Sequence, residues 1–221
     1  MSKMVIRVET LSSLMLGSGS GFGQTLDADI VFDSYGLPFF PARRLKGMLR
    51  ESAAEIAEIF IKAEIADFSA DIEVLFGTSV NQGLLQLYDL YPEDYYQTVE
   101  WLKWGFAEYP NFINKEAVLE TFTHIRYQTA IDDNGIAKET SLRSIRVLNP
   151  GIVFYGEIDD TEFTGDSSKL LALACLNLKQ AGSRRSRGLG EIRCSLWKNN
   201  ENYSSHVLTW LRRGATGHVQ N

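Results

Sequence analysis

The chain has 221 residues, of which 44% are apolar and 23% charged. These proportions are typical of one globular domain, or two that share a core, and exclude disordered, collagen-like and disulfide-rich classes. The net charge of −6 excludes a nonspecific polycationic surface.

The chain begins with a pattern of alternating apolar and polar residues over 3–9, which predicts a half-buried strand. Residues 16–23 are too rich in glycine for regular structure, residues 29–32 suit a short strand, and residues 33–36 are a turn signal. A helix is expected to open at Pro41, because proline suits the first helical turn. Apolar residues then recur at helical spacing and predict one core-facing side: Leu45, Leu49, Ala53, Ile56 and Phe60.

The middle of the chain gives weaker signals. Residues 75–78 and 83–87 predict a turn followed by a strand, and residues 91–122 are aromatic, acidic and partly helical. Asp-Asp-Asn-Gly at residues 132–135 is a strong turn signal and predicts the tip of a hairpin.

The last part of the chain returns to clear patterns. Residues 152–158 alternate as a strand, and residues 169–180 suit a helix with Ser167 as its N-cap and Gly182 as its terminator. A final strand follows over residues 192–196, with its apolar residues on one side.

These elements predict an α+β fold of the ferredoxin-like type, a βαββαβ sandwich with two helices on one face of the sheet. RNA-recognition modules share this layout. We expect one domain over residues 1–198 with glycine-rich loops and an insertion at about 91–150. A polar tail with room for one short helix covers residues 199–221.

The sequence gives little support for a membrane segment, a disulfide bond or a metal site. No apolar run approaches the ~20 residues of a membrane helix, and the N-terminus lacks an apolar signal-peptide segment. We therefore expect a cytoplasmic protein without a membrane partner. Cys175 and Cys194 stand among apolar neighbours and are expected to be small buried side chains. The three histidines lack the spacing of metal ligands, so no resident metal is predicted.

Two short basic segments stand out from the acidic chain. Residues 38–50 place cations at a helix start, where each opposes the helix dipole at a cost of up to ~1 kcal/mol. An anion bound at the helix start would offset this cost, so the cations are interpreted as an anion site. The alternative interpretation is that they form a charged, solvated helix face. The candidate RNA-binding residues of this segment are Arg43, Arg44, Lys46 and Arg50.

The second basic segment, residues 182–190, precedes the last strand and is interpreted as a basic loop or as a phosphate-gripping loop. In a ferredoxin-like sandwich the first and last strands are neighbours, so this loop would lie near the glycine run and the basic helix. Its candidate residues are Arg184, Arg185, Ser186 and Arg187. Arg126, together with Arg143, Ser144 and Arg146, would add a basic edge from the insertion.

The glycine run is no nucleotide-binding fingerprint, because Phe22 and Gln24 stand where a third glycine is required. It is either a flexible loop or a loop in which Gly17, Ser18 and Gly19 bring backbone N–H groups close to a phosphate.

Two aspartates, Asp27 and Asp29, follow the glycine run. In an extended segment they face the same way, so shared metal ligation or general-base chemistry is open to them. Pairs of this kind are also common in ordinary loops.

Together these motifs resemble the RAMP superfamily of CRISPR-associated proteins, the RNA-binding subunits of type III effector complexes. The most specific part is Leu-Pro-x-x-Pro-x-x-x-Leu-Lys-Gly-x-x-Arg over residues 37–50. Leu-Phe-Gly at residues 75–77, the stretch 129–151 and the arginine-rich loop add to a resemblance that runs from residue 4 to about 197. It implies a ferredoxin-like fold, binding of CRISPR RNA and assembly beside related subunits.

Within that family, Arg43-Arg44 looks more like the subunit that caps the 5′ tag of the guide RNA in type III-D and related systems than like the repeating backbone subunits. Backbone subunits often cut target RNA with an aspartate after the glycine run, and Asp27 is the nearest match.

Three functions follow as hypotheses. The first is a guide-RNA-binding subunit that needs no cofactor, with CRISPR RNA, a target RNA and other effector subunits as partners. The second is a target-RNA endonuclease that uses Asp27 and a divalent metal such as Mg²⁺. The third, a protein-interaction module, rests on the aromatic residues of the insertion: Tyr91, Tyr95, Tyr96, Trp101 and Trp104.

Overall fold

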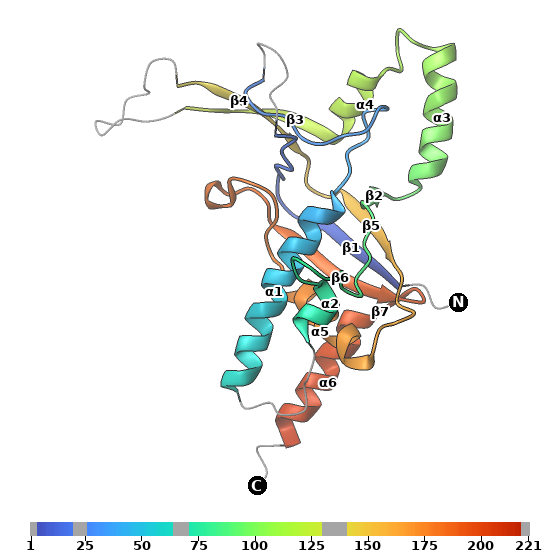
Figure 1. Ribbon diagram of the computed structural model, residues 1–221. Helices are drawn as coiled ribbons and strands as arrows, with labels where there is room; N and C mark the ends of the chain where they lie inside the picture. The colour runs from blue at the N-terminus through green and yellow to red at the C-terminus, as the bar shows by residue number, and fades with distance from the viewer. Residues whose placement is uncertain (1–3, 20–25, 64–70, 130–140, 218–221) are drawn as a thin grey trace, which may run out of the picture.

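A computed structural model describes residues 4–19, 26–63, 71–129 and 141–217 (Figure 1). In chain order its elements are β1 (Met4–Thr10), α1 (Ala42–Lys62), α2 (Ile72–Phe76), β2 (Tyr91–Pro92), α3 (Tyr95–Glu108), α4 (Lys115–Phe122), β3 (Thr123–Gln128), β4 (Arg143–Leu148), β5 (Val153–Ile158), α5 (Gly165–Asn177), the short 3-10 helix η1 (Arg185–Arg187), β6 (Ile192–Lys198), β7 (Glu201–Asn202) and α6 (Tyr203–Gly217).

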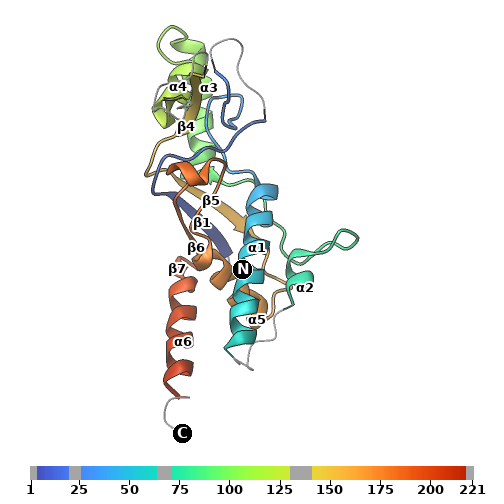
Figure 2. The same cartoon turned by 90° about the vertical axis from the view of Figure 1, so that its left-hand side faces the viewer.

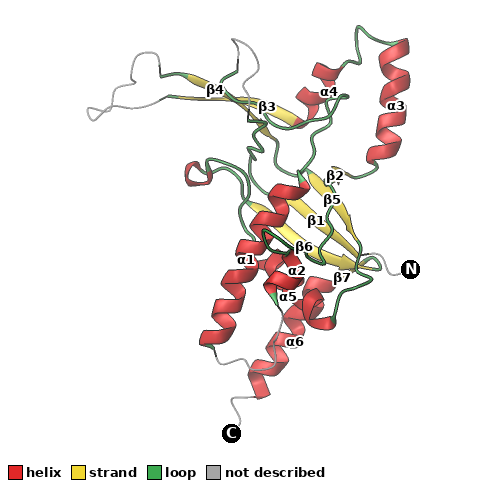
Figure 3. Ribbon diagram, in the orientation of Figure 1, coloured by secondary structure: helices red, strands yellow, loops and turns green. Residues whose placement is uncertain are grey.

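The main sheet has the order β2-β5-β1-β6-β7 and is antiparallel throughout (Figure 3). With α1 after β1 and α5 after β5, the elements β1, α1, β2, β5, α5 and β6 form a βαββαβ unit. Its first strand lies between its third and fourth strands. This is the ferredoxin-like arrangement predicted from the order of the elements.

The core lies between the sheet and the pair α1 and α5. Alternate residues of β1 are fully buried, namely Met4, Ile6 and Val8, as strand periodicity requires. Leu45 and Leu49 of α1 are equally buried in the same apolar cluster. The predicted strands over 3–9, 152–158 and 192–196 are therefore confirmed, as is the core-facing side of the helix that follows Pro41.

The prediction of a strand over residues 83–87 was wrong. Residues 72–76 form the short helix α2, which Asp71 caps by accepting the Glu73 N–H at 2.8 Å. Leu84 N and Leu85 N then donate to Val74 O and Leu75 O, so the chain folds back on this helix, and Leu87 makes only an isolated bridge to Ile158 of β5. Residues 29–32 likewise form only isolated bridges through Ile30 and Phe32.

The bounds of α5 also differ from the prediction. Thr164 is the N-cap, because its Oγ1 accepts the Ser167 N–H at 3.1 Å, and Ser167 lies inside the first turn. The helix ends at Asn177, several residues before Gly182. Gly182 serves a different contact, described below.

Between β2 and β5 the chain builds α3, α4 and the hairpin β3–β4, which projects from one end of the sheet (Figures 1 and 2). The predicted hairpin tip at residues 132–135 lies outside the described residues. Tyr95 ties α3 to the chain before α1 by donating its hydroxyl to Asp33 Oδ2 at 2.9 Å. Burial and this hydrogen bond raise the pKa of the Tyr95 hydroxyl.

The C-terminal helix α6 is longer than the short helix expected, and its first half packs on the core. Ser204 is fully buried and its Oγ accepts the Leu196 N–H at 2.9 Å, while Val207 is 3% exposed. In the part of the chain that the structure describes, no helix combines the length and apolar character that crossing a membrane requires.

Candidate nucleic-acid interface

The first turns of α1 present cations to solvent. Arg43, Arg44 and Arg50 are exposed, and none has a carboxylate partner among the described residues. Lys46 is half-buried and donates from Nζ to Leu85 O at 2.7 Å. Burial lowers the pKa of the Lys46 ammonium.

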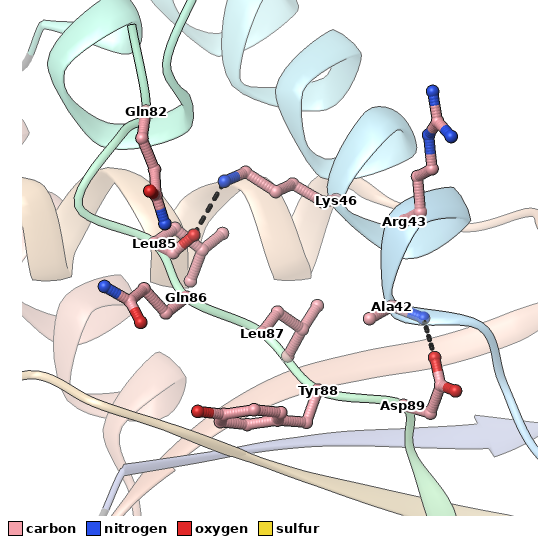
Figure 4. Close-up of a pocket in the computed structure, with 9 residues that line it drawn as sticks. All are labelled: Ala42, Arg43, Lys46, Gln82, Leu85, Gln86, Leu87, Tyr88 and Asp89. Carbon is pink, nitrogen blue, oxygen red and sulfur yellow. Dashed lines mark hydrogen bonds between the residues drawn. The ribbon is translucent and has the colours of Figure 1, made fainter.

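An acidic residue from far along the chain caps this basic helix. The first turn contains no acid of its own, but Asp89 Oδ1 accepts the Ala42 N–H at 2.8 Å across 47 positions (Figure 4). A carboxylate at a helix N-terminus is favourable, so Asp89 offsets part of the cost of the neighbouring arginines. The Ala42 N–H is consequently not available to an external anion.

The arginine-rich loop lies against the chain that follows β1. Ser183 N donates to Met15 O at 3.0 Å, and Gly190 N donates to Ser13 O at 2.9 Å. Gly182 has a φ of +75°, and a Cβ there would stand 2.4 Å from Met15 O. Glycine is required at this position because both the backbone conformation and the close contact exclude a side chain.

The same loop contacts the hairpin. Gln128 at the end of β3 accepts hydrogen bonds through Oε1 from Arg184 and from Arg187, the latter at 3.3 Å. This amide fixes the two guanidinium groups beside the hairpin, whereas Arg185 and Ser186 are exposed. The first turn of α1 and the loop with η1 both lie at the end of the sheet from which the hairpin projects (Figures 1 and 2).

The described part of the glycine run is paired and not free. Ser18 donates from N to Asp29 O at 2.8 Å and Gly17 bridges Ile30. The Ser18 N–H is therefore engaged within the protein. Gly19 is exposed with a φ of +85°, and a Cβ there would meet nothing within 4 Å.

The two aspartates that follow the glycine run differ in burial and in partner. Asp29 is 4% exposed, and its Oδ1 lies 3.1 Å from Arg146 Nε and accepts the Ile30 N–H at 2.8 Å. Asp27 is exposed and its Oδ2 accepts the Ser144 N–H at 2.8 Å. Both carboxylates thus contact β4 at residues two apart, but one is buried in an ion pair and the other is exposed.

The described ranges 4–19, 26–63, 71–129 and 141–217 contain no cluster of metal-ligating side chains. No group of three or more His, Cys, Asp or Glu side chains in them is placed to hold a metal ion. Asp29 is already paired with Arg146, so Asp27 stands as a single carboxylate beside Ser144, near the end of the hairpin that lies away from α4.

The cations of the described residues fall into two classes. One class pairs with carboxylates, as in Arg7–Glu9, Arg193–Glu9, Lys62–Glu58, Lys103–Glu100, Arg146–Asp29, Lys169–Asp166 and Lys198–Asp160. A second set has no such partner among the described residues and gathers on α1 and around the hairpin and arginine-rich loop: Arg43, Arg44, Arg50, Arg126, Arg143, Lys179 and Arg185. These two areas therefore hold most of the positive charge that has no carboxylate partner among the described residues.

The aromatic residues of the insertion also form two groups, one packed within the protein and one exposed. Tyr91 and Tyr95 stack on each other with ring centroids 4.0 Å apart and belong to the packing of α3. Tyr96, Trp101 and Trp104 are between 51% and 80% exposed. A large apolar surface of this kind on one helix is characteristic of a contact surface.

Comparisons with known proteins agree with this architecture. A family model described as RAMP superfamily matches residues 7–193. No curated protein matches the sequence. The fold is similar to a chain in the cryo-EM structure of the type III-B Cmr-beta bound to cognate target RNA, with TM-score 0.61, 12% identity, and coverage of 94% of this chain and 98% of the other. A chain of apo Cmr-beta gives TM-score 0.60, 14% identity, and coverage of 90% and 98%.

The buried ion pair between Asp29 and Arg146 yields a stability prediction. Arg146→Met leaves the Asp29 carboxylate buried without a counter-charge, so we expect the free energy of unfolding to fall by about 3 kcal/mol in urea titrations. Adding Asp29→Leu should restore a large part of that stability. Lys62→Met, which breaks an exposed pair with Glu58, is the control and should change stability by less than about 1 kcal/mol. Equal decreases in both single variants would contradict the prediction.

Proposed function

Because this chain belongs to the RAMP superfamily, we propose that it is a guide-RNA-binding subunit of a type III CRISPR effector complex. The distribution of its cations carries the proposal. Lys62 at the end of α1 and Arg7, Arg193 and Lys198 of the sheet pair with carboxylates. The arginines in the first turns of α1, and most of those around the hairpin, have no carboxylate partner among the described residues. The similar fold of a Cmr-beta chain, in a structure bound to target RNA, supports RNA and further subunits as partners.

Unpaired arginines suit a phosphate backbone for two reasons. They need not break an internal ion pair before they bind, and the planar guanidinium can donate two parallel hydrogen bonds to a phosphate. A chain of net charge −6 can hold RNA in this way, because only the track itself must be basic. No cofactor is required for such contacts.

The face of α1 supplies a further argument. Arg43, Gly47 and Arg50 are spaced so that they lie on one exposed stripe of the helix. A Cβ at Gly47 would meet nothing within 4 Å, so internal packing does not require glycine there. Bare helix backbone between two free arginines allows a sugar–phosphate chain to come close.

The arginine-rich loop and the hairpin form the second part of the proposed track. Arg184 and Arg187, both held by Gln128, and the exposed Arg185 and Ser186 would contact phosphates, with Arg126 on β3 beside them. Gly19 would add the close backbone approach that a residue without a side chain permits. RNA that touches both areas would cross the end of the sheet from which the hairpin projects.

We assign the exposed aromatic face of α3 to contacts with neighbouring subunits of the complex. Tyrosine and tryptophan are enriched at protein interfaces. Lys103 pairs with Glu100, so Glu108 leaves α3 with a net negative charge, which disfavours RNA at this surface. The protein-interaction hypothesis thereby becomes one part of the proposed role.

The charge argument predicts a change in salt dependence. Replacing Arg43, Arg44 and Arg50 by alanine should weaken binding of single-stranded guide RNA and reduce the slope of log K against log salt by about 0.7 for each phosphate that the variant no longer neutralises. Nitrocellulose filter binding at several salt concentrations measures both. The matched control replaces three paired cations, Lys62, Lys103 and Arg193, by alanine. If both triple variants change the slope equally, the proposed track is wrong.

A substitution at Gly47 should change the stability of the protein and its RNA binding in opposite directions. Alanine lowers the conformational entropy cost of folding, so Gly47→Ala is expected to raise the free energy of unfolding by about 0.5–1 kcal/mol. The same methyl group stands in the proposed path of the RNA and should weaken its binding severalfold. A variant that is more stable and binds RNA as the parent does would remove the backbone-approach argument.

The endonuclease alternative rests on Asp27 with a divalent metal such as Mg²⁺. Since Asp27 stands as a single exposed carboxylate, we expect Asp27→Asn to leave cleavage of matched target RNA unchanged in the assembled complex with Mg²⁺. Gel electrophoresis of end-labelled target measures the rate. Abolished cleavage, with guide-RNA binding intact, would favour the alternative.

A further inference from the structure

A pocket of about 440 Å³ opens between the first turns of α1 and the extended chain of residues 82–89 (Figure 4). That volume is within the range of pockets that bind small organic groups. It is lined by Ala42, Arg43, Lys46, Gln82, Leu85, Gln86, Leu87, Tyr88 and Asp89. Two hydrogen bonds hold its walls together, from Lys46 Nζ to Leu85 O at 2.7 Å and from Ala42 N to Asp89 Oδ1 at 2.8 Å.

The charged groups of the pocket are already engaged. Lys46 donates to a backbone carbonyl and Asp89 accepts the helix N–H, so neither is a free binding charge. The Asp89 carboxylate would also repel a phosphate placed inside. The interior of the pocket therefore suits a neutral ligand group better than an anion.

The remaining lining favours a flat heteroaromatic group. Leu85 and Leu87 form an apolar floor, and the Tyr88 ring, 68% exposed, offers a face for stacking. Gln82 and Gln86 are exposed, and their side-chain amides have no hydrogen-bond partner within the described residues. Each amide carries donors and an acceptor, which matches the mixed donor–acceptor edge of a nucleobase.

The position of the pocket makes RNA the source of such a group. Arg43 belongs both to the pocket rim and to the exposed cationic stripe of α1 (Figure 4). A phosphate held by the α1 arginines would leave its attached base near the pocket. In single-stranded RNA the bases can be unstacked and bound individually on aromatic side chains.

We infer that this pocket holds one unstacked nucleobase of the bound single-stranded RNA, stacked on Tyr88 and hydrogen-bonded by Gln82 and Gln86. The inference rests on the proposed function, since it requires RNA on α1. The pocket would contact a base of the RNA, whereas the arginine track contacts only its phosphates.

An abasic scan of the RNA tests the inference. The full-length protein is titrated with guide-length single-stranded RNAs that each lack one base in turn. Stacking on one aromatic side chain predicts a single position, or one repeating position, at which base removal weakens binding between about 5-fold and 150-fold. Tyr88→Ala should weaken binding of the intact RNA to a similar extent and abolish the sensitivity to that abasic position. Tyr88→Phe should retain both.

Tyr96→Ala is the matched control, because Tyr96 is 80% exposed on α3 and does not line the pocket. It should keep the parental abasic profile. If the parent binds RNA but no position is sensitive, or if Tyr88→Ala keeps the sensitivity, the pocket inference is overturned while the proposed function stands. If the parent binds no RNA at any salt concentration, the proposed function fails and the inference fails with it.

Discussion

The hydrogen bond from the Ala42 N–H to the Asp89 carboxylate is the contact on which the surface chemistry of this protein depends. It places a negative charge at the N-terminus of α1, where the local sequence has none. Arg43 and Arg44 can then remain unpaired beside the positive end of the helix dipole. The same bond fixes the chain before β2 against the helix, so one carboxylate supports both the exposed cations and the shape of the adjoining pocket.

The chain that follows β1 brings the other loops together. Backbone carbonyl groups within its residues 13–16 accept hydrogen bonds from N–H groups of the arginine-rich loop. Its residues 17–18 pair with the chain around Asp29. Asp29 in turn pairs with Arg146 of β4. Segments far apart in sequence thus meet around one stretch of irregular backbone, and the position of each depends on the hydrogen bonds of the next.

Sequence patterns predicted those parts of the fold that depend on local periodicity. The alternation in β1, β5 and β6 and the apolar stripe of α1 revealed strands and a helix because each buries one side. Contacts between distant residues left no such pattern: the cap by Asp89, the different partners of Asp27 and Asp29 on β4, and the guanidinium contacts of Gln128. The cationic segments were visible as composition, but only the structure shows which cations are paired. Of the two chain segments that line the pocket, the start of α1 was predicted correctly, whereas residues 83–87 predicted a strand that does not form.

The sheet ends on both sides in strands of only two residues, β2 and β7. One contains Pro92, which has no N–H to offer, and the other follows a tight turn in which Asn199 and Asn200 both have positive φ. Short edges of this kind give an incoming strand almost no ladder to extend. Copies of this protein at high local concentration therefore have almost no template for joining their sheets edge to edge into a fibre.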